Sequence, residues 1–173
     1  MILTGLEIAR QCREGAITIE PFEPERLNPQ SYNYRLGRSL KVHRTPAADT
    51  HAEHELEEIQ IPAKGIVLQP GTVYLGTTVE VLGSSTYAMR LIGRSSLGRL
   101  GLYLQYSADL GHRGSRHRWT LELEATQPIR VYAGMDIGQV SFWQTAGAVL
   151  PYLGTFGHRS DASVPPSGLL AAG

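Results

Sequence analysis

Short apolar runs, separated at regular intervals by proline and glycine, constrain the fold of this chain more than any other feature. Between positions 59 and 93 the β-branched runs are interrupted at Pro62, Gly65, the Pro70-Gly71 pair and Gly83. Strands broken about every eight to twelve residues are typical of a sandwich or barrel. The 19 glycines and 10 prolines among 173 residues also favour turns and short strands over long helices. We therefore predict one all-β domain covering residues 1–173.

One short helix is expected at the amino terminus. Thr4 and Glu7 have the spacing of a capping box, and the pattern predicts a helix from about Thr4 to Glu14. Alternating apolar side chains predict strands over 16–22, 32–36, 119–125 and 137–143, and the strand at 32–36 is expected to have a polar face. We interpret 45–58 as an exposed loop and 109–118 as a polar loop. Residues 147–173 are rich in glycine, serine and proline, which predicts a flexible carboxy-terminal lid or tail.

The charge balance and the single cysteine exclude several functional classes. The net charge is zero, so the chain lacks the overall field that attracts nucleic acid or a membrane surface, and we expect neither as a partner. Cys12 alone cannot form an internal disulfide, and a zinc-dependent nucleobase deaminase with its Cys-x-x-Cys pair is excluded. The glycine patterns of P-loop and Rossmann sites are absent as well. Without an apolar run of signal-peptide or membrane-span length, we expect a cytoplasmic protein. Because one cysteine cannot form a thiolate zinc site, we expect no zinc.

The decapeptide GRSSLGRLGL at positions 93–102 has the composition of an anion-binding segment. It combines Arg94, Ser95, Ser96 and Arg99 with three glycines, and leucines at 97, 100 and 102 are expected to anchor it to the core. Guanidinium groups pair with phosphate oxygens through two hydrogen bonds, hydroxyls add further bonds, and glycine lets a ligand approach the backbone. Arginine side chains in turns are often merely solvated. The combination within ten residues nevertheless favours binding of an anion.

Glu122 is the candidate proton carrier. The alternation in WTLELEA at 119–125 places Leu121 and Leu123 on one face of a strand and Glu122 on the other, together with Thr120 and Glu124. A carboxyl in a partly dry pocket has a raised pKa and can shuttle a proton for an attacking water. The alternative is a glutamate that simply faces solvent. Spacing alone leaves both interpretations open.

Taken together, these segments resemble the dCTP deaminase family of the dUTPase-like superfamily. The similarity lies in GRSSLGRLGL at 93–102, TLE at 120–122 and AGMDIGQVSF at 133–142, and it extends in order to MILTGLEIARQCREGAITIEPF at 1–22 and ERLNPQSYNYRLG at 25–37. The resemblance implies a distorted jelly-roll, a dUTPase-like β-barrel that assembles as a homotrimer with active sites at the subunit interfaces. It further implies hydrolytic deamination of dCTP to dUTP, with Mg²⁺ accompanying the triphosphate and no zinc.

The same resemblance gives individual residues expected roles. Glu122 would activate water for attack on C4 of cytosine, Ser95 would position that water, and Arg99 would help to balance the charge of the site. The expected substrate contacts are Arg94 and Ser96 at the phosphates, Ala108 beside the base, Thr120 in the TLE motif, His112 at the place of a sugar-contacting aspartate, and Tyr152 and Arg159 in the lid.

Two segments depart from the family pattern and keep other functions open. An ungapped alignment puts His112 where relatives carry the aspartate near the sugar, whereas an alignment with two shifts puts Asp109 at the corresponding aspartate of dUTPases. In the lid, Gly-Thr-Phe at 154–156 replaces the family's Gly-Lys-Tyr, and Arg159 could supply the missing cation. The alternatives are therefore a dUTP pyrophosphatase or bifunctional deaminase and pyrophosphatase, and a nucleotide-binding protein with altered or lost activity.

Overall fold

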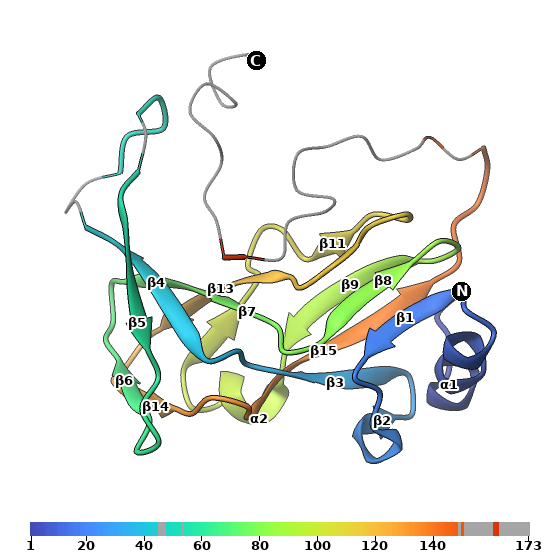
Figure 1. Cartoon of the computed structure of the whole chain (residues 1–173), viewed down its shortest axis with the longest axis horizontal. Helices are drawn as coiled ribbons and strands as arrows, with labels where there is room; N and C mark the ends of the chain where they lie inside the picture. Colours follow the sequence, from blue (N-terminus) through green and yellow to red (C-terminus); the bar gives the residue numbers. More distant parts are fainter. Residues whose placement is uncertain (45–47, 53, 149, 151–160, 163–173) are drawn as a thin grey trace.

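Two antiparallel five-stranded sheets form most of the fold (Figure 1). The computed structural model describes residues 1–44, 48–52, 54–148, 150 and 161–162. One sheet has the order β10-β13-β7-β4-β5, with bounds Leu102–Leu104, Thr120–Ala125, Val73–Thr77, Ser39–His43 and Leu56–Gln60. The other has the order β11-β9-β15-β3-β2, with bounds Leu110–Gly111, Ala88–Gly93, Asp136–Trp143, Ser31–Arg35 and Leu27–Asn28.

Two smaller sheets complete the β structure and confirm the predicted all-β class. One has the order β1-β8-β12, with bounds Ile17–Glu20, Val81–Ser84 and Arg116–His117, and the other pairs β14 with β6, over Ile129–Val131 and Ile66–Leu68. In Figure 1, β4, β5, β6 and β14 lie at one side of the molecule and β1, β2 and the amino-terminal helix at the other.

In the part of the chain that the structure describes, three short helical segments accompany the strands: α1 (Gly5–Arg13), the 3-10 turn η1 (Pro24–Arg26) and α2 (Ser95–Gly98). The start of α1 agrees with the prediction, because the Thr4 hydroxyl accepts a hydrogen bond from the Glu7 N–H at 3.3 Å. Among the residues that the structure describes, no helix has the length and apolar character that a membrane span requires.

Alternating side chains from both large sheets build one apolar core. On β13, Leu121 and Leu123 are fully buried, as the alternation predicted. On β3, the Tyr34 ring lies against Gly138 of β15, where a Cβ atom would collide with it. The Tyr34 hydroxyl donates to the Ile92 carbonyl at 3.1 Å. This close approach of β3, β15 and β9 fixes the end of β9, where the decapeptide begins.

Three local predictions need correction. The exposed segment ends before Leu56, because Leu56–Gln60 forms β5 at the edge of its sheet. The polar loop at 109–118 contains two short strands, β11 and β12, which pair with β9 and β8. The strand that carries Tyr32 and Tyr34 does not present a polar face at Asn33, whose buried amide oxygen accepts hydrogen bonds from Asn28 and Gln139.

Candidate active site

Glu122 lies in a small pocket beside the edge of the β10-β13 sheet. The pocket has a volume of about 170 Å³ and is lined by Val73, Tyr106, Ser107 and Glu124, in addition to Leu123 and Glu122 itself. The Glu122 side chain is half-buried, and burial raises the pKa of its carboxyl above the ordinary value. A carboxyl of this kind can accept a proton from water and return it at neutral pH more readily than a fully solvated one.

Gln105 holds the backbone of Glu122. The Gln105 Oε1 accepts a hydrogen bond from the Glu122 N–H at 2.7 Å, and the Gln105 N–H donates to the Glu122 carbonyl at 3.2 Å. Immediately after it, Tyr106 and Ser107 form one wall of the pocket, and the Tyr106 ring stacks on Tyr103 with centroids 5.4 Å apart. The strand pattern of the sequence gave no sign of this wall.

The decapeptide folds into the end of β9, one turn of helix and the start of β10. Arg94 is the N-cap residue of α2, and Ser95 is its first residue. Gly101 adopts a φ of 83°, in the left-handed region that glycine tolerates, and the chain turns there into β10. Of the three leucines expected to anchor the segment, Leu102 is buried and Leu97 packs against the core, but Leu100 is more than half exposed.

A second pocket, of about 300 Å³, lies beside the decapeptide. Its lining includes Arg94, Ser95 and Gly98 together with Tyr103 and Gln139. The Gln139 Nε2 donates to the Asn33 Oδ1 at 3.2 Å, which fixes the side chain at the wall of this pocket. Guanidinium, hydroxyl and amide groups around one cavity are suited to a polar, anionic ligand.

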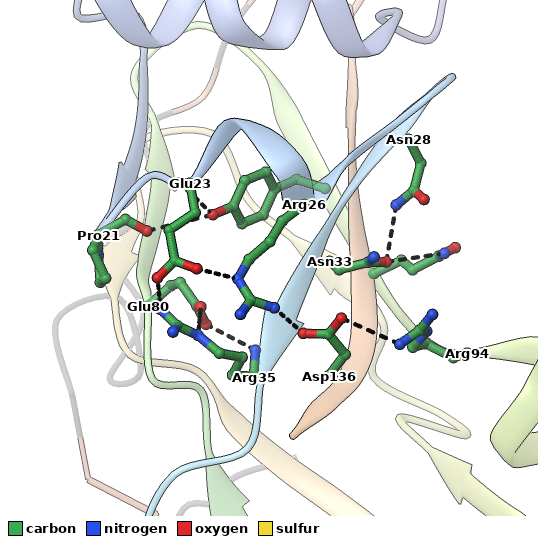
Figure 2. A network of polar contacts seen from close by, with 11 residues as sticks. Pro21, Glu23, Arg26, Asn28, Asn33, Arg35, Glu80, Arg94 and Asp136 are labelled. Atoms are coloured by element: carbon green, nitrogen blue, oxygen red, sulfur yellow. Dashed lines mark hydrogen bonds and ion pairs between the residues drawn. The ribbon is translucent and has the colours of Figure 1, made fainter. Parts of the chain in front are cut away.

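Figure 2 shows Arg94 at one end of a network of ion pairs. The Arg94 Nη1 donates to one carboxylate oxygen of Asp136 at 3.3 Å, and Arg26 pairs with the other oxygen. Arg26 also pairs with Glu23, through Nε and Oε2 at 2.6 Å. The carboxylate of Asp136 therefore links the predicted phosphate-binding arginine to the protein interior.

The remaining predicted site residues that the structure describes line neither of these two pockets. Ser96 and Arg99 are exposed on and just after α2. Ala108 is exposed, and its carbonyl accepts a hydrogen bond from the Gln105 Nε2 at 3.2 Å. The Thr120 hydroxyl donates to the Asp161 carbonyl at 3.4 Å, so a described part of the carboxy-terminal segment lies against β13. Tyr152 and Arg159 lie outside the described residues.

The two alternative alignments place the family's aspartate at His112 or at Asp109, and these residues lie on either side of β11. His112 is exposed directly after β11. Asp109 precedes β11, where its carboxylate pairs with Arg90 and its carbonyl accepts the Leu91 N–H at 2.8 Å. Asp109 is thus bound to β9, and its carboxylate already has a cationic partner.

Within one chain the structure does not bring the two halves of the predicted site together. Ser95 and Arg94 line the 300 Å³ pocket, Glu122 lines the 170 Å³ pocket, and the two linings share no residue. The sequence reasoning missed three residues of the pocket walls, Tyr106, Ser107 and Gln139. It also missed Gln105 and Asp136, which hold Glu122 and Arg94 in place.

Comparison with known proteins gives one consistent family. Residues 2–145 match the protein family described as dCTP deaminase-like. A "dCTP deaminase" of Rhodopirellula baltica is 44% identical over 148 residues, covering 85% of this chain and 74% of the relative. A "dCTP deaminase, dUMP-forming" of Leptospira biflexa is 39% identical over 152 residues, covering 88% and 87%.

A solved structure agrees at the level of the fold. The crystal structure of 2'-deoxycytidine 5'-triphosphate deaminase from Agrobacterium tumefaciens superimposes with a TM-score of 0.65 at 23% identity. The superposition covers 82% of this chain and 47% of the solved chain, so this chain spans about half the length of that protein.

Proposed function

Because this chain belongs to the dCTP deaminase-like family, we propose that it hydrolyses the exocyclic amino group of a cytosine nucleotide, with dCTP as the substrate. The observation that carries the proposal is the half-buried Glu122 carboxyl, whose pKa is raised by burial, in a pocket large enough for water and the edge of a base.

The proposed chemistry uses Glu122 twice. Its carboxylate takes a proton from a water, the resulting hydroxide attacks C4 of cytosine, and a C4–O bond forms. The attack moves the electron pair of the C4–N3 double bond onto ring N3. The carboxyl then returns the proton to the amino nitrogen, the bond between C4 and this nitrogen breaks, and ammonia leaves, while the hydrogen of the new C4 hydroxyl moves to N3 as the C4=O bond of uracil forms. A raised pKa suits a group that is base in one step and acid in the next. In this scheme Ser95 positions the water, and Arg99 helps to balance the charge.

The phosphates are proposed to bind beside α2. Arg94 and Ser96 would contact phosphate oxygens, Ala108 and Thr120 the base side, and His112 the sugar. Tyr152 and Arg159 would contact the nucleotide from the carboxy-terminal segment. No group of three or more metal-binding side chains occurs among the described residues. Mg²⁺ would therefore enter with the nucleotide, held chiefly by its phosphate oxygens and by water.

A homotrimer with shared sites is part of the proposal. Two observations support it: Ser95 and Glu122 line separate pockets in one chain, and apolar side chains beside these pockets are exposed. Of these exposed side chains, Ile92 and Tyr103 line the 300 Å³ pocket and Tyr106 lines the 170 Å³ pocket. A neighbouring subunit packed on this face would cover them and bring its own Ser95 to Glu122. A single domain and a cytoplasmic location stay predictions.

Release of pyrophosphate at the same site is a second candidate activity. The Leptospira relative is named a dUMP-forming enzyme, whereas the Rhodopirellula relative carries no such qualifier. The product is therefore either dUTP, which the family resemblance implied, or dUMP with pyrophosphate. For dUMP formation, a second water would have to reach the α-phosphate.

One assay tests both candidates. The protein is incubated with Mg²⁺ and dCTP, CTP or dCMP, and ammonia and pyrophosphate are followed separately. We expect ammonia from dCTP and a loss of about 10²- to 10⁴-fold in Glu122→Gln, the usual contribution of a general base. If no nucleotide yields ammonia, the deaminase proposal is wrong. Tight nucleotide binding without any product would instead identify a nucleotide-binding protein that has lost turnover.

A further inference from the structure

Gln105 has the most unusual backbone conformation near the pocket of Glu122. Its φ is 52°, and it is the one residue other than glycine with a positive φ in the part of the chain that the structure describes. The left-handed region is unfavourable for a residue with a Cβ atom, so the surroundings must hold it there. The side chain is also only 7% exposed, which is rare for a glutamine.

Every polar group of the Gln105 side chain is used in holding two segments together. Its Oε1 accepts the Glu122 N–H at 2.7 Å, and its Nε2 donates to the Ala108 carbonyl at 3.2 Å. The main-chain N–H bonds the Glu122 carbonyl at 3.2 Å. One residue therefore fixes both backbone polar groups of Glu122 and the far end of the 106–108 turn.

The left-handed conformation explains how the pocket wall is made. The β10-β13 pairing ends at Leu104 and Leu123. Gln105, the residue after β10, still donates its main-chain N–H to the Glu122 carbonyl, and the chain then turns away from β13. Its side-chain oxygen then takes the place of a strand carbonyl as the acceptor for Glu122. The chain that leaves Gln105 in this direction brings Tyr106 and Ser107 to the pocket.

We propose that Gln105 is a positioning residue that holds the Glu122 carboxyl and the 106–108 turn in the geometry needed for proton transfer. The expected effect of Gln105 on turnover rests on the proposed deaminase function. The expected effect of Gln105 on the titration of Glu122 does not depend on that function. The pocket contains two other titratable side chains, Glu124 and Tyr106. The Gln105 side chain bonds neither of them, because its partners are the Glu122 N–H and the Ala108 carbonyl.

Four variants separate the contributions of Gln105. Gln105→Met keeps the volume and removes both side-chain bonds, while Gln105→Glu keeps an acceptor for the Glu122 N–H and adds a negative charge. Gln105→Gly removes the side chain and also relieves the left-handed conformation, so it supplies a foldable variant if Gln105→Met is unstable. Gln127→Ala is the matched control, because the Gln127 Nε2 likewise donates to a backbone carbonyl, that of Leu100, at 3.1 Å.

The first readout is the titration midpoint of Glu122, followed by NMR of ¹³C-labelled glutamate carboxyls and assigned by its loss in Glu122→Gln. Gln105→Met and Gln105→Gly both lose the bonds that tie the 106–108 turn to Glu122. Release of this turn should let water reach the carboxyl, so the midpoint should fall toward the ordinary glutamate value. In Gln105→Glu it should rise, because a like charge is held next to the Glu122 peptide. A residue that only stabilises the fold would not produce opposite shifts.

The second readout is the rate of ammonia release from dCTP. We expect kcat to fall about 10- to 100-fold in Gln105→Met and Gln105→Gly, the range that a small displacement of a catalytic group costs, and to stay unchanged in Gln127→Ala. Unchanged midpoints, or shifts of one sign in Gln105→Met and Gln105→Glu, would overturn the positioning role. If the wild-type protein releases no ammonia, the proposed function fails, while the titration still decides the role of Gln105.

Discussion

Glu80 should be among the most sensitive charged positions for stability, and the structure allows the size of the effect to be worked out. Its side chain is fully buried. The two carboxylate oxygens accept the Arg35 N–H at 2.9 Å and the Arg35 Nε–H at 2.7 Å. In Glu80→Gln one of these oxygens becomes an NH₂ group that faces an N–H donor. One buried donor then has no acceptor, and the guanidinium loses a charged partner.

Breaking one side of a buried ion pair costs about 3–5 kcal/mol. The Arg35 Nη2 still pairs with the Glu23 Oε1 at 2.8 Å, so we place Glu80→Gln at the lower end, about 3 kcal/mol. In a chain of this length each kcal/mol lowers Tm by about 2–4 °C, which gives a drop of about 6–12 °C. Thermal unfolding by circular dichroism and the urea midpoint measure this loss directly.

The chain offers a matched control in Glu14→Gln. The Arg10–Glu14 pair has the same N···O distance as Arg35–Glu80, 2.7 Å, but its two side chains are 51% and 50% exposed. Because water and salt screen exposed pairs, Glu14→Gln should change Tm far less, and its small effect should disappear in 0.5 M salt, roughly where screening becomes short-ranged. If both variants lower Tm equally, burial does not determine the strength of these ion pairs and the reasoning is refuted.

Three further predictions test other charged or buried groups. Because burial raises the pKa of Glu122, the folded state binds a proton more readily than the unfolded state, so stability is lost as pH rises through the ordinary glutamate range toward the folded pKa. Glu122→Gln removes this dependence and should gain stability relative to wild type as pH rises above the ordinary glutamate value; a pH-independent difference would contradict it. Asp136→Asn should raise KM for dCTP about tenfold, the value of one charge-assisted hydrogen bond, with much less effect on deoxycytidine, because Asp136 holds Arg94. An equal effect on both substrates would argue against that role. Finally, burial raises the pKa of Cys12 to about 11. At pH 8 only about one thiol in 10³ is then ionised, so iodoacetamide should react slowly with the folded protein and fast in urea, whereas equal rates would contradict the burial of this thiol.

Elements with a local signal could be predicted from the sequence. The capping contact between Thr4 and Glu7 forms as expected, and the alternation around Leu121 and Leu123 gives both the strand and the face that carries Glu122. These signals depend on residues only a few positions apart, so they can be recognised without knowledge of the fold.

Elements that depend on distant partners could not be predicted. The sequence of β5, LEEIQ, is mostly polar and lacks a clean alternation, and it becomes a strand because β4 pairs with it at the edge of a sheet. The pairs β12-β8 and β11-β9 likewise form between segments far apart in the chain. The turn at Gln105 contains no glycine, so the sequence did not predict its left-handed conformation. The pocket wall formed by Tyr106 and Ser107 was therefore not predicted either.

The placement of Arg94 and Glu122 in different sheets has an electrostatic consequence for the proposed reaction. Arg94 follows β9 of one large sheet and Glu122 lies on β13 of the other, and they line separate pockets. A guanidinium next to Glu122 would lower the pKa of the carboxyl, whereas burial raises it. Because Arg94 is paired with Asp136 and the Glu122 carboxyl is half-buried in a separate pocket, one chain holds both groups in the states that the chemistry needs. If neighbouring subunits complete each site, the triphosphate brings its own negative charge to the arginines. The bound nucleotide itself would then prevent the phosphate-binding cations from lowering the proton affinity of Glu122.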